Sequence, residues 1–280
     1  MAIAELKEAV ILLKKLPSLW ISGIIGGILV AALWVTFNLS GTFFAGRLLV
    51  IFGLVLLLFT TGSLVIIRNN EGDIRTIFTG GLRYYFRVLL PQLIIIFAFI
   101  LIITVVMVTF SLLGISSDVN NGAALAIGFS IPLLVLTLFF DTAAVFEEKK
   151  VFDSIRRSIQ LVLSHFNEVI AFLLVSSAVI IGIIFMLMII WEAFLYDNLE
   201  PITRYNETQL QTFTPDQLIQ MVGPGGMWIT AVILFIGACL LIPVLYTYKA
   251  CFFRKISHGV TVTQQPVTGE YDSKGRWYKY

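Results

Sequence analysis

The chain has 280 residues, of which 58% are hydrophobic and only 13% are charged, with 19 Lys and Arg against 17 Asp and Glu. Soluble domains average about 25% charged residues, so this chain has too few polar side chains to cover a globule of its size. The composition excludes a soluble enzyme and a disordered protein, and a net charge of +2 is too small for a nucleic-acid-binding protein, which leaves a multi-pass helical membrane protein.

Six apolar runs of about 20 residues are long enough to cross a bilayer as helices. The connections after the second, fourth and sixth runs are basic, and all 19 Lys and Arg except Arg47 and Arg204 fall on that side. The positive-inside rule therefore predicts a six-span protein of the cell (plasma) membrane whose N- and C-termini are cytoplasmic. The runs cover residues 19–38, 44–67, 88–113, 122–140, 169–191 and 227–248.

A stretch with apolar residues at helical spacing precedes each pair of runs, at residues 3–16, 73–90 and 149–166. Basic or polar residues occupy the opposite faces, which is typical of helices that lie in the membrane interface. Pro17 and Pro91 are expected to separate the first two stretches from the spans that follow. The predicted fold is all-α: six transmembrane helices in three hairpin units, each preceded by a cytoplasmic interfacial amphipathic helix. In the first stretch the predicted apolar face comprises Ile3, Leu6, Val10 and Leu13.

We expect a six-helix transmembrane domain over residues 1–255 and a polar cytoplasmic tail over residues 256–280. The outer loop at 192–226 contains Thr214-Pro215-Asp216-Gln217, a capping-box pattern that predicts a short helix ending near residues 223–226. The same loop carries a glycosylation sequon at Asn206, and the sequence leaves open whether Asn206 is modified. In the tail, a hairpin across Asp272–Gly275 and disorder both remain possible.

Five arginines on the polar faces of the predicted interfacial helices are candidates for contact with lipid headgroups. Basic residues in this setting attract anionic lipids, so we expect membrane lipids, chiefly anionic ones, as partners. A protein partner or a second copy of the chain is the other possibility. The arginines are Arg75, Arg83, Arg87, Arg156 and Arg157.

Asp141 is the main ionisable residue at membrane depth. An unpaired charge at this depth costs roughly 2.5–3.5 kcal/mol on insertion scales. Two interpretations follow. Asp141 pairs with an Arg or Lys of an interfacial helix and latches that helix to the bundle, or it serves as a proton or cation relay or as a contact to a headgroup.

Gly23 and Gly27 form a small-residue face in the first predicted span. Such a face lets another helix approach closely, either within one chain or in a homodimer. Among the other residues, His165 and His258 are isolated in sequence, and Cys239 and Cys251 have no partner at metal-ligand spacing. We therefore expect neither a metal site nor a cofactor.

Two segments after the fourth run are DTAAVFEE at 141–148 and VFDSIRRSIQL at 151–161. They resemble a stretch in uncharacterised prokaryotic, often archaeal, six-span membrane proteins related to the membrane domain of some glycerophosphodiester phosphodiesterases. That group has a Val-Glu pair where Phe146 here separates Val145 from Glu147. The resemblance implies a membrane module without the hydrolase domain, and it carries over no functional residues.

Three function classes follow. The first is a non-enzymatic membrane module that binds lipid or a partner protein. The second is a small transporter or channel with a path past Asp141. The third is an intramembrane enzyme acting on lipid, which a cluster of polar groups at the cytoplasmic face would favour.

Overall fold

The computed structural model describes residues 2–112, 128, 130–206, 213–259, 269–271 and 277–279. Over these residues the protein is helical apart from one antiparallel two-stranded ribbon in the tail, which fits the hairpin alternative, although its predicted turn lies outside the described residues. The elements are α1 (Ala2–Lys15), the 3-10 turn η1 (Pro17–Leu19), α2 (Trp20–Asn69), α3 (Ile74–Leu112), α5 (Phe140–Phe146), α6 (Val151–Ser164), α7 (Phe166–Phe194), α8 (Tyr196–Leu199), the 3-10 turn η2 (Glu200–Arg204), α10 (Pro215–Gly259), β1 (Gly269–Tyr271) and β2 (Trp277–Lys279).

Four of the described helices are long and apolar enough to cross a membrane. Only 6% of the most apolar stretch of α3 or of α7 is buried inside the protein, which is typical of helices surrounded by lipid. The all-α class is confirmed and the protein has the helices of a membrane protein, whereas six spans stay a prediction. Residues 122–127 and 129 of the fourth predicted span, 122–140, lie outside the described residues, and the described part from residue 130 belongs to a shorter apolar helix at Ser130–Phe146. The four helices cover Pro17–Asn69, Ile74–Phe110, Phe166–Phe194 and Gln217–Ser257.

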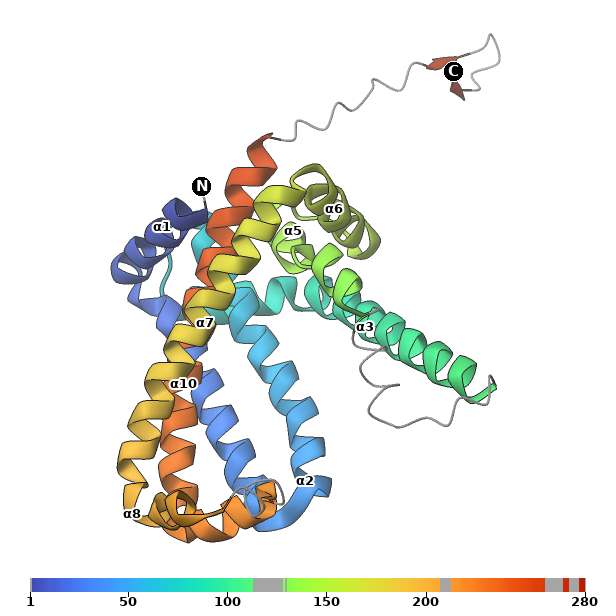
Figure 1. Cartoon of the computed structure of the whole chain (residues 1–280). Coiled ribbons are helices and arrows are strands. Elements are labelled where there is room, and N and C mark those ends of the chain that lie inside the picture. Colours follow the sequence, from blue (N-terminus) through green and yellow to red (C-terminus); the bar gives the residue numbers. More distant parts are fainter. Residues whose placement is uncertain are drawn as a thin grey trace.

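α2 consists of two limbs that meet at Gly41. This glycine has φ 76° and ψ −179°, a backbone conformation that other residues rarely adopt. Residues 20–40 and 42–69 run in opposite directions on either side of it (Figure 1). A straight helix of 50 residues would be about 75 Å long, more than twice the ~30 Å hydrocarbon core of a bilayer. The limbs correspond to the first two predicted runs.

α10 is divided in a similar way at Gly223, whose φ is 66°. The predicted capping box starts its short first segment. The backbone N–H of Thr214 donates to Gln217 Oε1 at 2.9 Å, and the N–H of Gln217 donates to Thr214 Oγ1 at 3.4 Å. This confirms the short helix predicted for the outer loop. Beyond Gly223, the long segment of α10 runs beside α7 and α2 (Figure 1).

α3 differs from the prediction. Pro91 was expected to end an interfacial helix over 73–90, but α3 continues through Pro91 from Ile74 to Leu112. Proline removes one helical hydrogen bond by lacking an N–H, and neighbouring groups in a membrane protein can satisfy the carbonyl that this leaves free. Pro17 behaves as expected, because it opens the turn η1 that separates α1 from α2.

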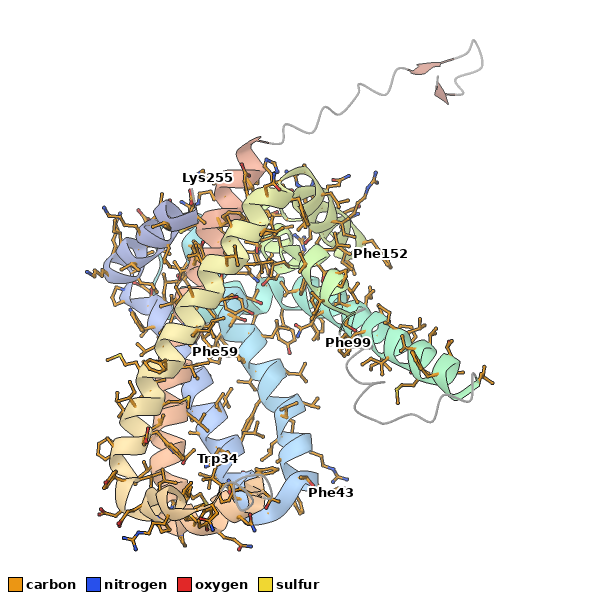
Figure 2. All side chains as sticks on the ribbon, in the orientation of Figure 1. Trp34, Phe43, Phe59, Phe99, Phe152 and Lys255 are labelled. Carbon is orange, nitrogen blue, oxygen red and sulfur yellow. The ribbon has the colours of Figure 1, made fainter. Side chains whose placement is uncertain are left out.

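The aromatic core lies at the end of the molecule that holds α1, α5 and α6 (Figure 1). The ring of Phe139 lies 5.9, 5.8 and 6.1 Å from those of Phe172, Phe252 and Phe253 and so ties the start of α5 to α7 and α10. We call this end, with the adjoining ends of α2, α3 and α10, the α1 end, and the opposite end the Gly41 end. Lys255 lies at the α1 end (Figure 2).

Candidate functional site

Four of the five candidate arginines are exposed at the α1 end. Arg75, Arg83 and Arg87 follow one another at spacings of eight and four residues, which places them along one side of α3. Arg87 also donates to the backbone carbonyl of Glu148 at 3.4 Å. Arg156 is exposed on α6, which contacts α3. We call these four arginines the basic surface.

Large apolar side chains lie beside the basic surface. On α3 they recur every four residues, on a side of the helix adjacent to that of the arginines. On α6, the large apolar side chain of Phe152 is 73% exposed and lies at the outer edge of the molecule (Figure 2). The exposed residues of α3 are Ile74 at 69%, Phe78 at 51%, Leu82 at 53% and Phe86 at 66%.

Arg157, the fifth candidate, points into the protein. Its side chain is only 7% exposed and forms a two-pronged ion pair with Glu147. Nε lies 3.0 Å from both carboxylate oxygens, and Nη2 lies 2.9 Å from Oε1. The pair fastens α6 to the chain that leaves α5. Arg157 is therefore a structural residue in this fold, unlike its neighbour Arg156.

Arg68, Tyr84 and Glu148 form a network that the sequence did not reveal. Nη1 of Arg68, at the end of α2, lies 3.1 Å from Glu148 Oε1 and 2.8 Å from the carbonyl of Val145. The hydroxyl of Tyr84, on α3, donates to the same Glu148 oxygen at 2.5 Å. The hydrogen bonds from Tyr84 and Arg68 lower the pKa of Glu148 below its usual value because they stabilise the carboxylate. The network joins α2, α3 and the segment after α5.

Asp141 is buried and forms an ion pair with Lys249 of α10. Its other oxygen accepts from the backbone N–H of Thr142 at 2.7 Å. One interpretation of the sequence gave Asp141 a cationic partner on an interfacial helix. The partner is a cation, but its predicted location was wrong, because Lys249 belongs to a long apolar helix. The pair ties α5 to α10.

α1 is fastened by a similar contact. The carboxylate of Glu5, which is 4% exposed, forms an ion pair with Lys255 of α10. The predicted apolar face of α1 is partly wrong, because Glu5 and Ala9 face inward while Ile3 is 73% exposed. The short side chain of Ala9 lets α1 pack closely against its neighbours, and the ion pair offsets the burial of Glu5.

Gly23 and Gly27 lie against α10 of the same chain. A Cβ atom at Gly23 would be 2.4 Å from the carbonyl oxygen of Cys239, and one at Gly27 would be 2.7 Å from that of Phe235. Only glycine allows these backbones to approach so closely. This small-residue face is thus covered by α10 within the chain.

The partners of the charged residues could not be found from the sequence, but one signal was available. Glu147 and Glu148 directly follow an apolar helix, on the side of the membrane where the positive-inside rule also predicts Arg68 and Arg157. Opposite charges at one level favour pairing. Among the described residues, no group of three His, Cys, Asp or Glu is arranged to hold a metal ion.

No family model matches this chain, and neither a curated protein nor a solved structure is significantly similar to it. The resemblance carried by residues 141–161 therefore stays a prediction.

Proposed function

We propose that this protein is a non-enzymatic, multi-pass module of the plasma membrane that binds anionic phospholipid at its cytoplasmic face through the basic surface. The proposal rests on the placement of exposed arginines beside exposed apolar side chains on α3 and α6. Apolar side chains enter the boundary of the hydrocarbon, while guanidinium groups at the same level contact phosphates.

In this proposal the chain forms six spans in three hairpin units, and α1, the first half of α3, and α6 lie in the cytoplasmic interface. Two observations support it. α2 already contains two antiparallel limbs, and the ion pair between Glu5 and Lys255 brings both ends of the helical body to the same side. Most of the basic residues gather at that side, which is cytoplasmic by the positive-inside rule.

An intramembrane enzyme acting on lipid would also need polar groups at this face. The three carboxylates on α5 and directly after it each form an ion pair with a cation from another part of the fold. A carboxylate held in this way ties segments of the chain together and is not poised as a general base. This arrangement favours a binding module. The carboxylates are those of Asp141, Glu147 and Glu148.

The test compares two double variants that remove equal charge. Arg83→Gln/Arg87→Gln alters the basic surface, whereas Arg47→Gln/Arg204→Gln removes two exposed arginines elsewhere. Each basic residue near an anionic membrane contributes about 1 kcal/mol, so the first variant should lose roughly 30-fold in affinity for phosphatidylglycerol. Binding is measured by native mass spectrometry of the purified protein titrated with phosphatidylglycerol or phosphatidylcholine.

The control variant should bind phosphatidylglycerol as the wild type does, and phosphatidylcholine binding should not change in either variant. Equal losses in the two variants would mean that total charge, and not this surface, attracts the lipid. If the wild-type sample contains a stoichiometric companion protein that Arg83→Gln/Arg87→Gln loses, the basic surface binds a protein partner and not a lipid.

A further inference from the structure

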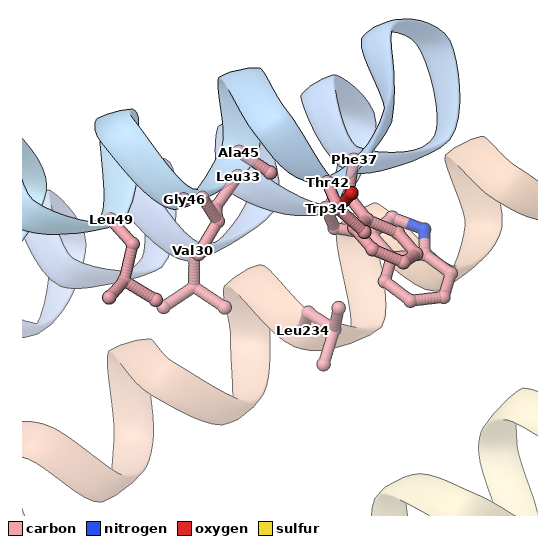
Figure 3. A pocket seen from close by; sticks show the side chains of 9 residues that line it. All are labelled: Val30, Leu33, Trp34, Phe37, Thr42, Ala45, Gly46, Leu49 and Leu234. Carbon is pink, nitrogen blue, oxygen red and sulfur yellow. The ribbon is translucent and has the colours of Figure 1, made fainter.

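An apolar slot lies at the Gly41 end, between the two limbs of α2 and α10. Its volume is about 460 Å³, within the range of pockets that hold small ligands. Figure 3 shows the side chains that line it, with Val30, Trp34 and Phe37 on the first limb and Leu234 on α10. The slot lies in the apolar stretches of both helices.

The slot exists because the second limb offers small side chains to the first. The limbs are joined at Gly41 and approach each other again at Gly26, where a Cβ atom would lie 3.2 Å from a methyl group of Leu56. Between these points the second limb contributes Ala45 and Gly46 to the wall. A Cβ atom at Gly46 would have no neighbour within 4 Å.

The slot is suited neither to staying empty nor to holding water. If it were empty, the side chains of its walls would lack contacting atoms and would lose dispersion energy. A trapped water needs two to four polar partners, and the side chains of the wall offer only the Thr42 hydroxyl and the Trp34 indole N–H. That N–H already donates to the carbonyl of Met227 at 3.2 Å. Hydrocarbon is the medium that surrounds the slot in a bilayer.

We propose that the slot binds one acyl chain of a membrane lipid. This site is independent of the basic surface, because it lies at the opposite end of the molecule (Figure 1) and recognises a hydrocarbon chain rather than a phosphate. A second apolar slot of about 430 Å³ lies between α7 and α10, on the far side of Val30 and Leu234. It serves as an internal reference in the test.

The test uses nanodiscs of phosphatidylcholine in which a fraction of the lipid carries a diazirine on one acyl chain. After illumination, lipid adducts are mapped on the protein by mass spectrometry. Gly46→Leu should fill the slot, because Gly46 is part of its wall and a Cβ atom there has open space. The matched control is Gly182→Leu, a glycine of α7 that also has open space and lines neither slot.

Gly46→Leu should lower the adducts on residues 30–49 at least fivefold and leave those on residues 184–191 unchanged. Gly182→Leu should leave the adducts on 30–49 at the wild-type level, and Leu49→Ala, which enlarges the slot, should raise them. Unfolding temperatures establish that each variant is folded. Adducts on 30–49 that are insensitive to Gly46→Leu, or no denser than those on exposed parts of α7, would overturn the proposal. Because phosphatidylcholine is zwitterionic, failure here leaves the basic surface untouched.

Discussion

The ionisable residues at the α1 end form pairs that link segments far apart in the chain. Asp141 and Lys249 are 108 residues apart, and Glu5 and Lys255 are 250 apart. In a medium of low dielectric constant, each member of such a pair depends on the other, since losing one partner leaves a buried charge uncompensated. The pair of Asp141 and Lys249 is the most enclosed case that involves a membrane helix, with side chains 7% and 14% exposed.

We expect Asp141→Asn to lower the free energy of unfolding by about 3–5 kcal/mol, because the Lys249 ammonium would remain buried without its partner. The double variant Asp141→Asn/Lys249→Met removes both charges and should recover most of the loss. The measurement is the unfolding midpoint in a mild detergent. Glu200→Gln is the control, since the exposed pair of Glu200 and Arg204 should contribute only about 0–1 kcal/mol.

This experiment also separates the latch from a transport role for Asp141. A latch predicts a loss of stability that the double variant repairs. A small transporter with a path past Asp141 predicts that Asp141→Asn abolishes flux in proteoliposomes while the unfolding midpoint stays near that of the wild type. Asp141→Asn and Glu200→Gln with equal midpoints would contradict the latch.

The sequence identified Asp141 because a carboxylate stands out in an apolar run, but it did not identify the partner. Pairing depends on how helices align, and Lys249 becomes a neighbour only once α10 packs beside α5. Arg156 and Arg157 show the same limit at closer range. Successive residues of a helix point about 100° apart, so one of the two is exposed and the other is paired with Glu147.

At the scale of elements, close contact between helices depends on glycines. Gly62 of α2 and Gly81 of α3 lie where the two helices meet, and Cβ atoms there would be 2.1 Å from the Ile77 carbonyl oxygen and 2.4 Å from that of Leu58. These obstacles are backbone atoms, which cannot rotate away as a flexible side chain can. The contact holds the second limb of α2 against α3.

Gly62→Ala should therefore destabilise the protein by about 1–3 kcal/mol through overpacking, even though alanine favours a helix more than glycine does. Gly53→Ala, on the same limb with no neighbour within 4 Å, should instead be neutral or stabilise by roughly 0.5–1 kcal/mol. Both effects are read from unfolding midpoints in the same detergent. A Gly62→Ala midpoint equal to that of Gly53→Ala would show that the helices are less closely packed than described.

The long apolar helices could be predicted from the sequence because a membrane helix must be apolar over a fixed length. The interval between the first two apolar runs contains Gly41, where α2 reverses. The same reasoning failed at Pro91, since one missing hydrogen bond does not end a helix. It named Gly23 and Gly27 but not Gly62 and Gly81, which lie 19 residues apart on two helices and form no local motif.

At the scale of the whole molecule, the charge distribution and the fold indicate the same polarity. The basic surface, the ion pairs of Glu5, Asp141, Glu147 and Glu148 and the start of α1 lie at the α1 end, whereas the Gly41 end carries the apolar slots and α8. Membrane proteins keep Lys and Arg on the cytoplasmic side. The two proposed lipid sites would then engage opposite leaflets, with a headgroup bound inside and an acyl chain bound toward the outside.

This polarity predicts the sidedness of single cysteines in a variant that lacks Cys239 and Cys251. Cysteines at Glu71 and Asp153, exposed positions at the α1 end, should react with a charged maleimide only in inside-out vesicles. A cysteine at Asp197 on α8 should react only in right-side-out vesicles. The control is a cysteine at Leu174, which is 67% exposed within apolar α7 and should react in neither, because the reagent does not enter hydrocarbon.

Each pattern of labelling has a distinct meaning. If Glu71 and Asp153 react on opposite sides, the ion pair between Arg68 and Glu148 cannot exist in the membrane, because it requires the segments next to these residues to share one side. If both react only from the outside, the fold stands but its orientation is reversed, and the basic surface would face the outer leaflet. Labelling of both from the inside and of Asp197 from the outside places the arginines against the cytoplasmic leaflet, where anionic lipids and their negative surface potential are found.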